Sequence, residues 1–139
     1  SAFVEVSMLN YAALSYRLER WDDAEGGYGA LYESAKIDEN RFLAKVGIMR
    51  SAFKGRKFDK SLQYAKTLVE DHRSDAALKQ EASYVIAKSY MAQSHRDEAL
   101  AIWRTLSADT STAYGAEAAF MLIQDSYDRG NFQEVENLL

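Results

Sequence analysis

The 139-residue sequence contains no proline and no cysteine, and each absence narrows what the chain can be. Proline is the strongest helix breaker, so a chain that lacks it and has only seven glycines can form long, uninterrupted helices. Without cysteine there is no disulfide, no thiol nucleophile and no cysteine-ligated metal or cluster. The lack of cysteine does not identify the cellular compartment, because cysteine-free proteins occur on both sides of a membrane.

An excess of positive charge and long apolar runs are also missing. The formal net charge of −4 argues against non-specific binding to nucleic acid, and against anchoring to anionic lipid through basic residues. No apolar run approaches the roughly 18 residues that a membrane-spanning helix needs. The opening residues do not resemble a signal peptide, because Glu5 interrupts them and no basic segment precedes them. The remaining composition, 47% hydrophobic and 27% charged, is typical of a globular domain.

The sequence repeats itself at intervals of about 37 residues. The segment Glu81–Ile86 recurs as Glu117–Leu122, 36 residues later. A second pattern, in which a large residue and two polar residues precede a small or apolar one, occurs at Trp21–Ala24, Phe58–Ser61, Arg96–Ala99 and Phe132–Val135. The last residues of these four segments, 24, 61, 99 and 135, are spaced by 37, 38 and 36. An internal repeat of this length is the signature of a stacked, repetitive fold.

Apolar residues within each unit follow helical spacing. In the third unit, Ala99, Trp103 and Leu106 mark one face of a helix. The sequence predicts an all-α fold of eight helices, the last cut off mid-turn, near 3–18, 22–36, 39–54, 59–72, 75–92, 95–107, 111–128 and 132–139. The predicted N-caps are Asp22, Asp38, Asp59, Ser74, Ser94 and Asn131, and Gly55 and Gly130 are the expected left-handed residues that end first helices.

Two segments carry a family resemblance. Tyr11–Ala24 and Ile86–Leu100 resemble the tetratricopeptide repeat (TPR), which has an apolar and small pair, an aromatic residue four positions on, a turn with Gly or Asp, and an alanine in its second helix. Ala12 and Ala87 keep the small residue, whereas Met49 and Ile123 replace it, so the second and fourth units are degenerate. The period is longer than the usual 34 residues of the family, and its frequent proline is missing.

The resemblance covers nearly the whole chain and implies a right-handed superhelix, or solenoid, of antiparallel helical hairpins. It implies one domain, residues 1–139, with repeats near 3–37, 38–73, 74–108 and an incomplete 109–139, as part of a longer protein. The linkers 70–80 and 107–115 are similar to those of bacterial cell-envelope members, such as lipoproteins of outer-membrane assembly. That similarity favours the periplasm or cell envelope over the cytoplasm.

No motif predicts catalysis, a cofactor or a metal site. His72 and His95 lie 23 residues apart, and no HExxH motif is present. Gly26, Gly27 and Gly29 form a glycine cluster, but a phosphate loop follows a strand, and these residues lie inside a predicted helix. We interpret the cluster as close packing between two helices, and we expect a protein that is not an enzyme.

In the TPR family, first helices line a concave surface that binds peptides. The register places three columns on that surface: Tyr16, Phe53, Met91 and Tyr127; Arg17, Lys54, Ala92 and Asp128; Ala13, Arg50, Lys88 and Gln124. The predicted partner-binding groove comprises Tyr16, Arg17, Arg50, Phe53, Lys54, Lys88, Met91 and Tyr127. Its cations, in an acidic protein, would suit an acidic or carboxylate-bearing peptide. The function expected is therefore a protein–protein interaction scaffold.

Other interpretations remain open. In one of them, the aromatic column packs between repeats, and the cations simply lie on a solvated outer face. The chain would be a structural or assembly module of a cell-envelope complex if it stacks on another domain, or on a second copy through an open end at Leu139. The repeats would only support the rest of the molecule if they belong to a larger ligand-binding protein or enzyme.

Overall fold

The computed structural model describes all 139 residues and contains eight α-helices and no strand. The helices are α1 (Ala2–Arg17), α2 (Trp21–Ser34), α3 (Asp38–Lys54), α4 (Phe58–Glu70), α5 (Ala76–Ala92), α6 (Arg96–Leu106), α7 (Ala113–Asp128) and α8 (Phe132–Leu138). The predicted all-α fold is confirmed, and each helix begins and ends within two residues of its expected bounds.

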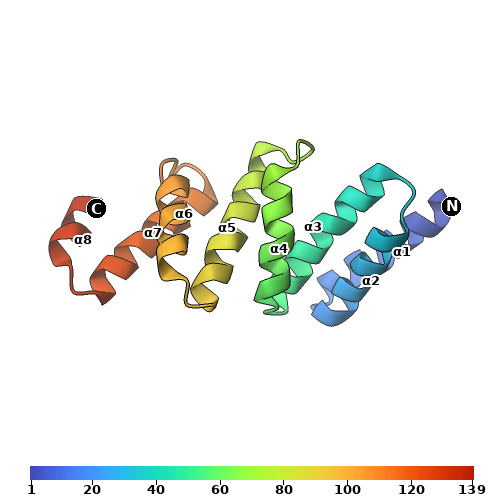
Figure 1. The fold of residues 1–139 in the computed structure, drawn as a ribbon, viewed down its shortest axis with the longest axis horizontal. Helices are drawn as coiled ribbons and strands as arrows, with labels where there is room; N and C mark the ends of the chain where they lie inside the picture. Colours follow the sequence, from blue (N-terminus) through green and yellow to red (C-terminus); the bar gives the residue numbers. More distant parts are fainter.

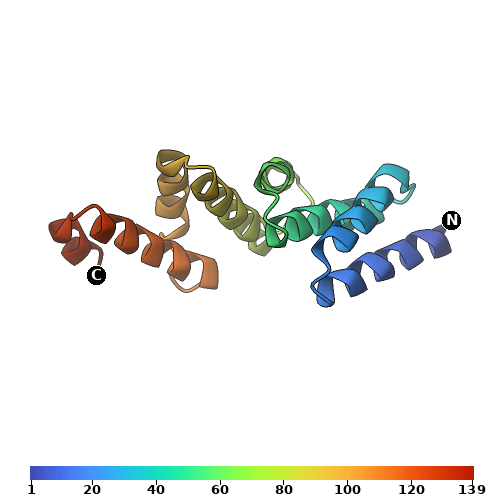
Figure 2. The same cartoon turned by 90° about the horizontal axis from the view of Figure 1, so that it is seen from below.

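The helices form an elongated row with the two termini at opposite ends (Figure 1). Each helix packs against the next one in the chain. The backbones of α1, α3, α5 and α7 also approach one another in turn, whereas those of α2, α4 and α6 do not. In Figure 2, α2 lies above α1, α4 above α3, and α6 above α7. The first helix of each pair therefore lies on one side of the array and the second helix on the other.

Two apolar clusters form most of the core, and α5 contributes to both. One cluster joins α3, α4 and α5 around Met49 and Leu68, and the other joins α5, α6 and α7 around Trp103. Ala24, Ser61 and Ala99, the small residues of the repeated pattern, are all completely buried. Any larger side chain at these positions would have to displace a neighbouring helix, which explains why the pattern keeps them small.

The four turns inside the helix pairs share one backbone geometry. Glu19, Arg56, Ser94 and Gly130 are the residues with positive φ, at 58°, 63°, 63° and 73°. After each of them, the next N–H donates back to a carbonyl five residues earlier: Arg20 to Ser15, Lys57 to Ala52, His95 to Tyr90 and Asn131 to Ser126. Residues 19, 56, 94 and 130 are spaced by 37, 38 and 36, the same intervals that the sequence pattern shows. The repeat is therefore present in the backbone as well as in the sequence.

Most of the predicted caps were wrong. Of the six residues, only Asn131 is an N-cap, and its side chain accepts from the N–H of Glu134. The side chains that cap α1, α5 and α7 belong to Ser1, Asp75 and Thr112. The predicted Asp22, Asp38 and Asp59 lie inside first turns, where negative charge is favoured by the helix dipole. Ser74 instead closes the end of α4, donating to the carbonyl of Leu68.

Two predictions about glycine, one on left-handed turn residues and one on close helix packing, were only partly correct. Gly130 has the left-handed conformation, but Gly55 has φ of −78°, and the left-handed residue in that turn is Arg56. In the glycine cluster of α2, only Gly27 makes a close approach, because a Cβ there would lie 3.1 Å from the Cβ of Ala12. Gly26 and Gly29 face open space.

The turn geometry predicts a gain in stability. Non-glycine residues in the left-handed region carry a strain of about 1–2 kcal/mol, which glycine avoids. We expect Glu19→Gly and Ser94→Gly each to raise the free energy of unfolding by about 1 kcal/mol in urea denaturation. Ala101→Gly, an exposed change inside α6, should instead lower it by about 1 kcal/mol. If both turn variants were destabilised as much as Ala101→Gly, the shared turn geometry would be wrong.

Candidate functional site

All eight residues of the predicted groove lie on α1, α3, α5 or α7, and the surface that these four helices form is here called the first-helix face. The structure gathers six of them into two separate hollows. Tyr16 and Arg50 line one, and Phe53, Lys54, Lys88 and Met91 line the other. Arg17 and Tyr127 are exposed and line neither; the ring of Tyr127 packs on Phe132, 5.6 Å between centroids.

The first hollow, here the Arg50 hollow, lies between α1 and α3 and encloses about 170 Å³. Tyr28 from α2 reaches into it beside Leu43 and Val46. Gly47 makes room for Tyr28, because a Cβ at that position would come within 2.4 Å of the tyrosine ring. A glycine in the middle of α3 therefore costs helix propensity but allows an aromatic ring to reach the first-helix face.

Arg50 is not the free cation that the sequence suggested. Its guanidinium donates two hydrogen bonds to the carboxylate of Glu81 on α5, at 2.8 and 2.7 Å. These bonds raise the pKa of Arg50 above its ordinary value. The ion pair links α3 to α5 across the face. Of the four predicted cations, only Arg17, Lys54 and Lys88 remain without an ion-pair partner.

Tyr84 on α5 is the centre of an aromatic cluster on the same face. Its ring contacts Phe53, Trp103 and Tyr114, with centroids 6.3, 5.7 and 5.0 Å away. Its hydroxyl donates to the carboxylate of Glu117 on α7 at 2.7 Å. Burial, and then this hydrogen bond, raise the pKa of Tyr84 well above its usual range, so the phenol stays protonated.

The groove columns included Phe53 but missed Tyr84, Trp103 and Tyr114, although the sequence held a signal for part of this cluster. Glu81 and Glu117 open the two segments that match at a spacing of 36 residues. In the structure, each of these glutamates binds a side chain on the preceding first helix, Arg50 or Tyr84. The repeated glutamate is therefore a repeated link between neighbouring first helices. No comparable signal marks Tyr114, whose position follows from the packing of α7.

The second hollow, here the Lys54 pocket, lies between the ends of α3 and α5 and the start of α4. It encloses about 510 Å³ and is lined by Phe53, Lys54, Arg56, Phe58, Lys88, Met91 and Ala92. The guanidinium of Arg56 lies over the ring of Phe58, 5.1 Å from its centroid. No acidic residue lines the pocket. It therefore combines apolar walls with three cations and no carboxylate to neutralise them.

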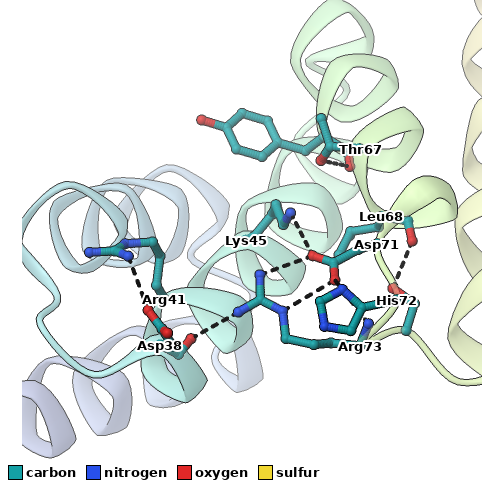
Figure 3. A network of polar contacts seen from close by, with 10 residues as sticks. Asp38, Arg41, Lys45, Thr67, Leu68, Asp71, His72 and Arg73 are labelled. Atoms are coloured by element: carbon teal, nitrogen blue, oxygen red, sulfur yellow. Dashed lines mark hydrogen bonds and ion pairs between the residues drawn. The ribbon is translucent and has the colours of Figure 1, made fainter.

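A polar network around Asp71 lies at the other end of the helices, where α4 leads into α5 (Figure 3). The Asp71 carboxylate accepts from Arg73 at 3.0 Å and from Lys45 at 2.9 Å. Arg73 also donates to the backbone carbonyl of Asp38. The hydrogen bonds from Arg73, followed by the one from Lys45, hold the pKa of Asp71 far below its usual range. Because these cations are already paired with Asp71, the network fixes the linker onto α3 and offers no free charge to a ligand.

The structure brings together no three His, Asp or Glu side chains that could hold a metal ion. His72 and His95 are both exposed and lie in different turns. No helix is long and apolar enough to span a bilayer.

The fold and the first-helix face together define an all-α protein with a helical-repeat-like structure. Comparison of the chain with protein-family models, with curated proteins and with solved structures finds no match in any of the three.

Proposed function

We propose that this chain is a TPR-like protein-interaction scaffold that holds a partner protein or peptide on its first-helix face and carries out no chemistry of its own. One observation carries the proposal. An aromatic cluster around Tyr84 and the cationic Lys54 pocket lie side by side on the first-helix face, and Phe53 belongs to both. Aromatic and arginine side chains dominate the energetics of many protein interfaces.

The packing of the helices supports a superhelix of the TPR type. First helices approach one another along the row, while the backbones of second helices stay apart and α2 meets α4 through side chains such as the rings of Tyr32 and Tyr64. A row that is tighter on one side curves toward that side, so the first-helix face would be concave. A right-handed solenoid of this kind presents its inner surface to extended or helical peptides.

Partner capture tests the proposal. Leu43 lies in the Arg50 hollow and is partly exposed, so Leu43→Glu should place a charge on the first-helix face without removing core packing. Proteins that co-purify with the wild-type chain from the cells that produce it should be recovered roughly tenfold less with this variant. The matched control is Gln63→Glu, which adds the same charge on an exposed position of α4. Equal recovery with both variants would remove the first-helix face from the proposal.

A second candidate, an assembly module that stacks end to end, is favoured by the outer face of α1. Phe3, Tyr11 and Leu14 are exposed there, whereas the residues at the same repeat positions in α3, Asn40, Ile48 and Ser51, are buried. Residues Phe132, Leu138 and Leu139 are exposed around α8 at the other end. In this alternative a helix of a neighbouring domain or of a second copy would cover the α1 face, as α2 covers α3.

A further inference from the structure

The Lys54 pocket is lined by positively charged side chains and by no negatively charged one. The chain has a net charge of −4, and most of its buried or half-buried charged side chains are paired. Lys54 and Arg56 are exposed and Lys88 is half-buried; none of the three forms an ion pair or donates a side-chain hydrogen bond, and all three line the same hollow.

The walls between these cations are apolar. Phe53 and Phe58 meet edge to face with centroids 6.2 Å apart, and Met91 completes the lining from α5. Arg56 stacks on Phe58, and a stacked guanidinium keeps the N–H groups at its edge free to bind a carboxylate. A volume of about 510 Å³ lies within the range of roughly 300–1,000 Å³ that is typical of ligand pockets.

We propose that the Lys54 pocket anchors an acidic peptide segment, with an aromatic or large aliphatic side chain between Phe53, Phe58 and Met91 and neighbouring carboxylates on Lys54, Arg56 and Lys88. This inference rests on the proposed scaffold function and names the chemistry of the partner. An extended chain advances about 3.3 Å per residue, so acidic residues directly after the apolar one reach the cations at the rim. Inorganic anions share the charge but would leave the apolar walls uncovered.

Methyl and amide NMR spectra of the full chain test the proposal with synthetic peptides. In the first peptide two glutamates follow a phenylalanine; in the second they are glutamines; in the third alanine replaces the phenylalanine. The first should shift the Met91 methyl and the amides of Lys54 and Lys88 saturably. The second and third should bind roughly tenfold more weakly or not at all.

Charge reversal provides the matched variants. Lys54→Glu/Lys88→Glu should weaken binding of the first peptide at least roughly tenfold, whereas Lys66→Glu/Arg104→Glu, with the same change in net charge on α4 and α6, should leave it unchanged. Arg50 is excluded from the variants, because it is paired with Glu81 and its reversal would disturb the link between α3 and α5. Thermal melting confirms that both double variants remain folded.

Each outcome decides the question. If inorganic phosphate alone gives the same shifts at the same concentration, the pocket is a simple anion site and the peptide proposal is overturned. If the peptide shifts Tyr16 and Tyr114 but not Met91, the scaffold function keeps its support while the pocket proposal fails. If no peptide produces shifts, the pocket proposal fails, and the scaffold function is judged by partner capture with Leu43→Glu alone.

Discussion

Replacing Trp103 with alanine is expected to lower the free energy of unfolding by about 3–5 kcal/mol, the usual cost of removing a fully buried large aromatic side chain. Trp103 has no exposed surface, and it packs against α5 and α7 as well as within α6. For a chain of this length the total stability is of the order of 7–20 kcal/mol, so the loss is a large fraction of it. Urea denaturation followed by circular dichroism measures the change.

The matched control for Trp103 is Phe120→Ala on α7. Phe120 is 58% exposed and belongs to no core cluster, so its removal should cost less than about 1 kcal/mol. If the two variants lost similar stability, the cluster around Trp103 would not be the core of the second half of the chain.

Replacing Asp71 with asparagine is expected to cost about 1–3 kcal/mol at pH 7, because it leaves the Lys45 ammonium, 13% exposed, without its charged partner. The pKa of Asp71 is lowered by folding, so its carboxylate contributes stability that is fully present above the unfolded value of about 3.9. That contribution disappears as the pH falls through the lower, folded pKa. The difference between wild type and variant should therefore shrink from pH 5 to pH 2.

Urea denaturation at pH 7, 5, 3 and 2 checks this pH dependence. Asp97→Asn is the control, because Asp97 is exposed and forms no ion pair or side-chain hydrogen bond, and it should change stability by no more than about 0.5 kcal/mol at any pH. If the stability difference between wild type and Asp71→Asn instead grew toward low pH, the pH dependence would be opposite to the expected one. That result would contradict the network in Figure 3.

The helices were predictable because the sequence signals that define a helix lie within the helix itself. Apolar spacing and a repeat of 37, 38 and 36 residues placed all eight within two residues of their bounds. Their ends were less predictable, because capping depends on backbone angles that several residue types can adopt. Arg56 occupies the left-handed position although Gly55 stands next to it, since the N–H of Lys57 must reach the carbonyl of Ala52 to close the turn.

The candidate site was only partly predictable, because its contacts join different repeats. Four residues of the predicted groove, Phe53, Lys54, Lys88 and Met91, line one pocket in the structure. The register could not show that Arg50 is neutralised by Glu81, 31 residues away, since that depends on how closely α3 approaches α5. Phe58 and Arg56 were missed for the same reason: they belong to a turn and to the start of a second helix, outside the columns of the first helices.

Site-specific photo-crosslinking tests the central claim, that a partner binds the first-helix face, most directly. Benzoylphenylalanine would be introduced in place of Tyr16 on that face, of Gln63 on α4, or of Tyr11 on the exposed outer face of α1. The account predicts that, in cells that produce the protein, a partner protein crosslinks at Tyr16 and not at Gln63 or Tyr11. Crosslinks at Tyr11 alone would favour end-to-end assembly, and crosslinks at Gln63 alone would place the partner on the second helices; either result would contradict the claim.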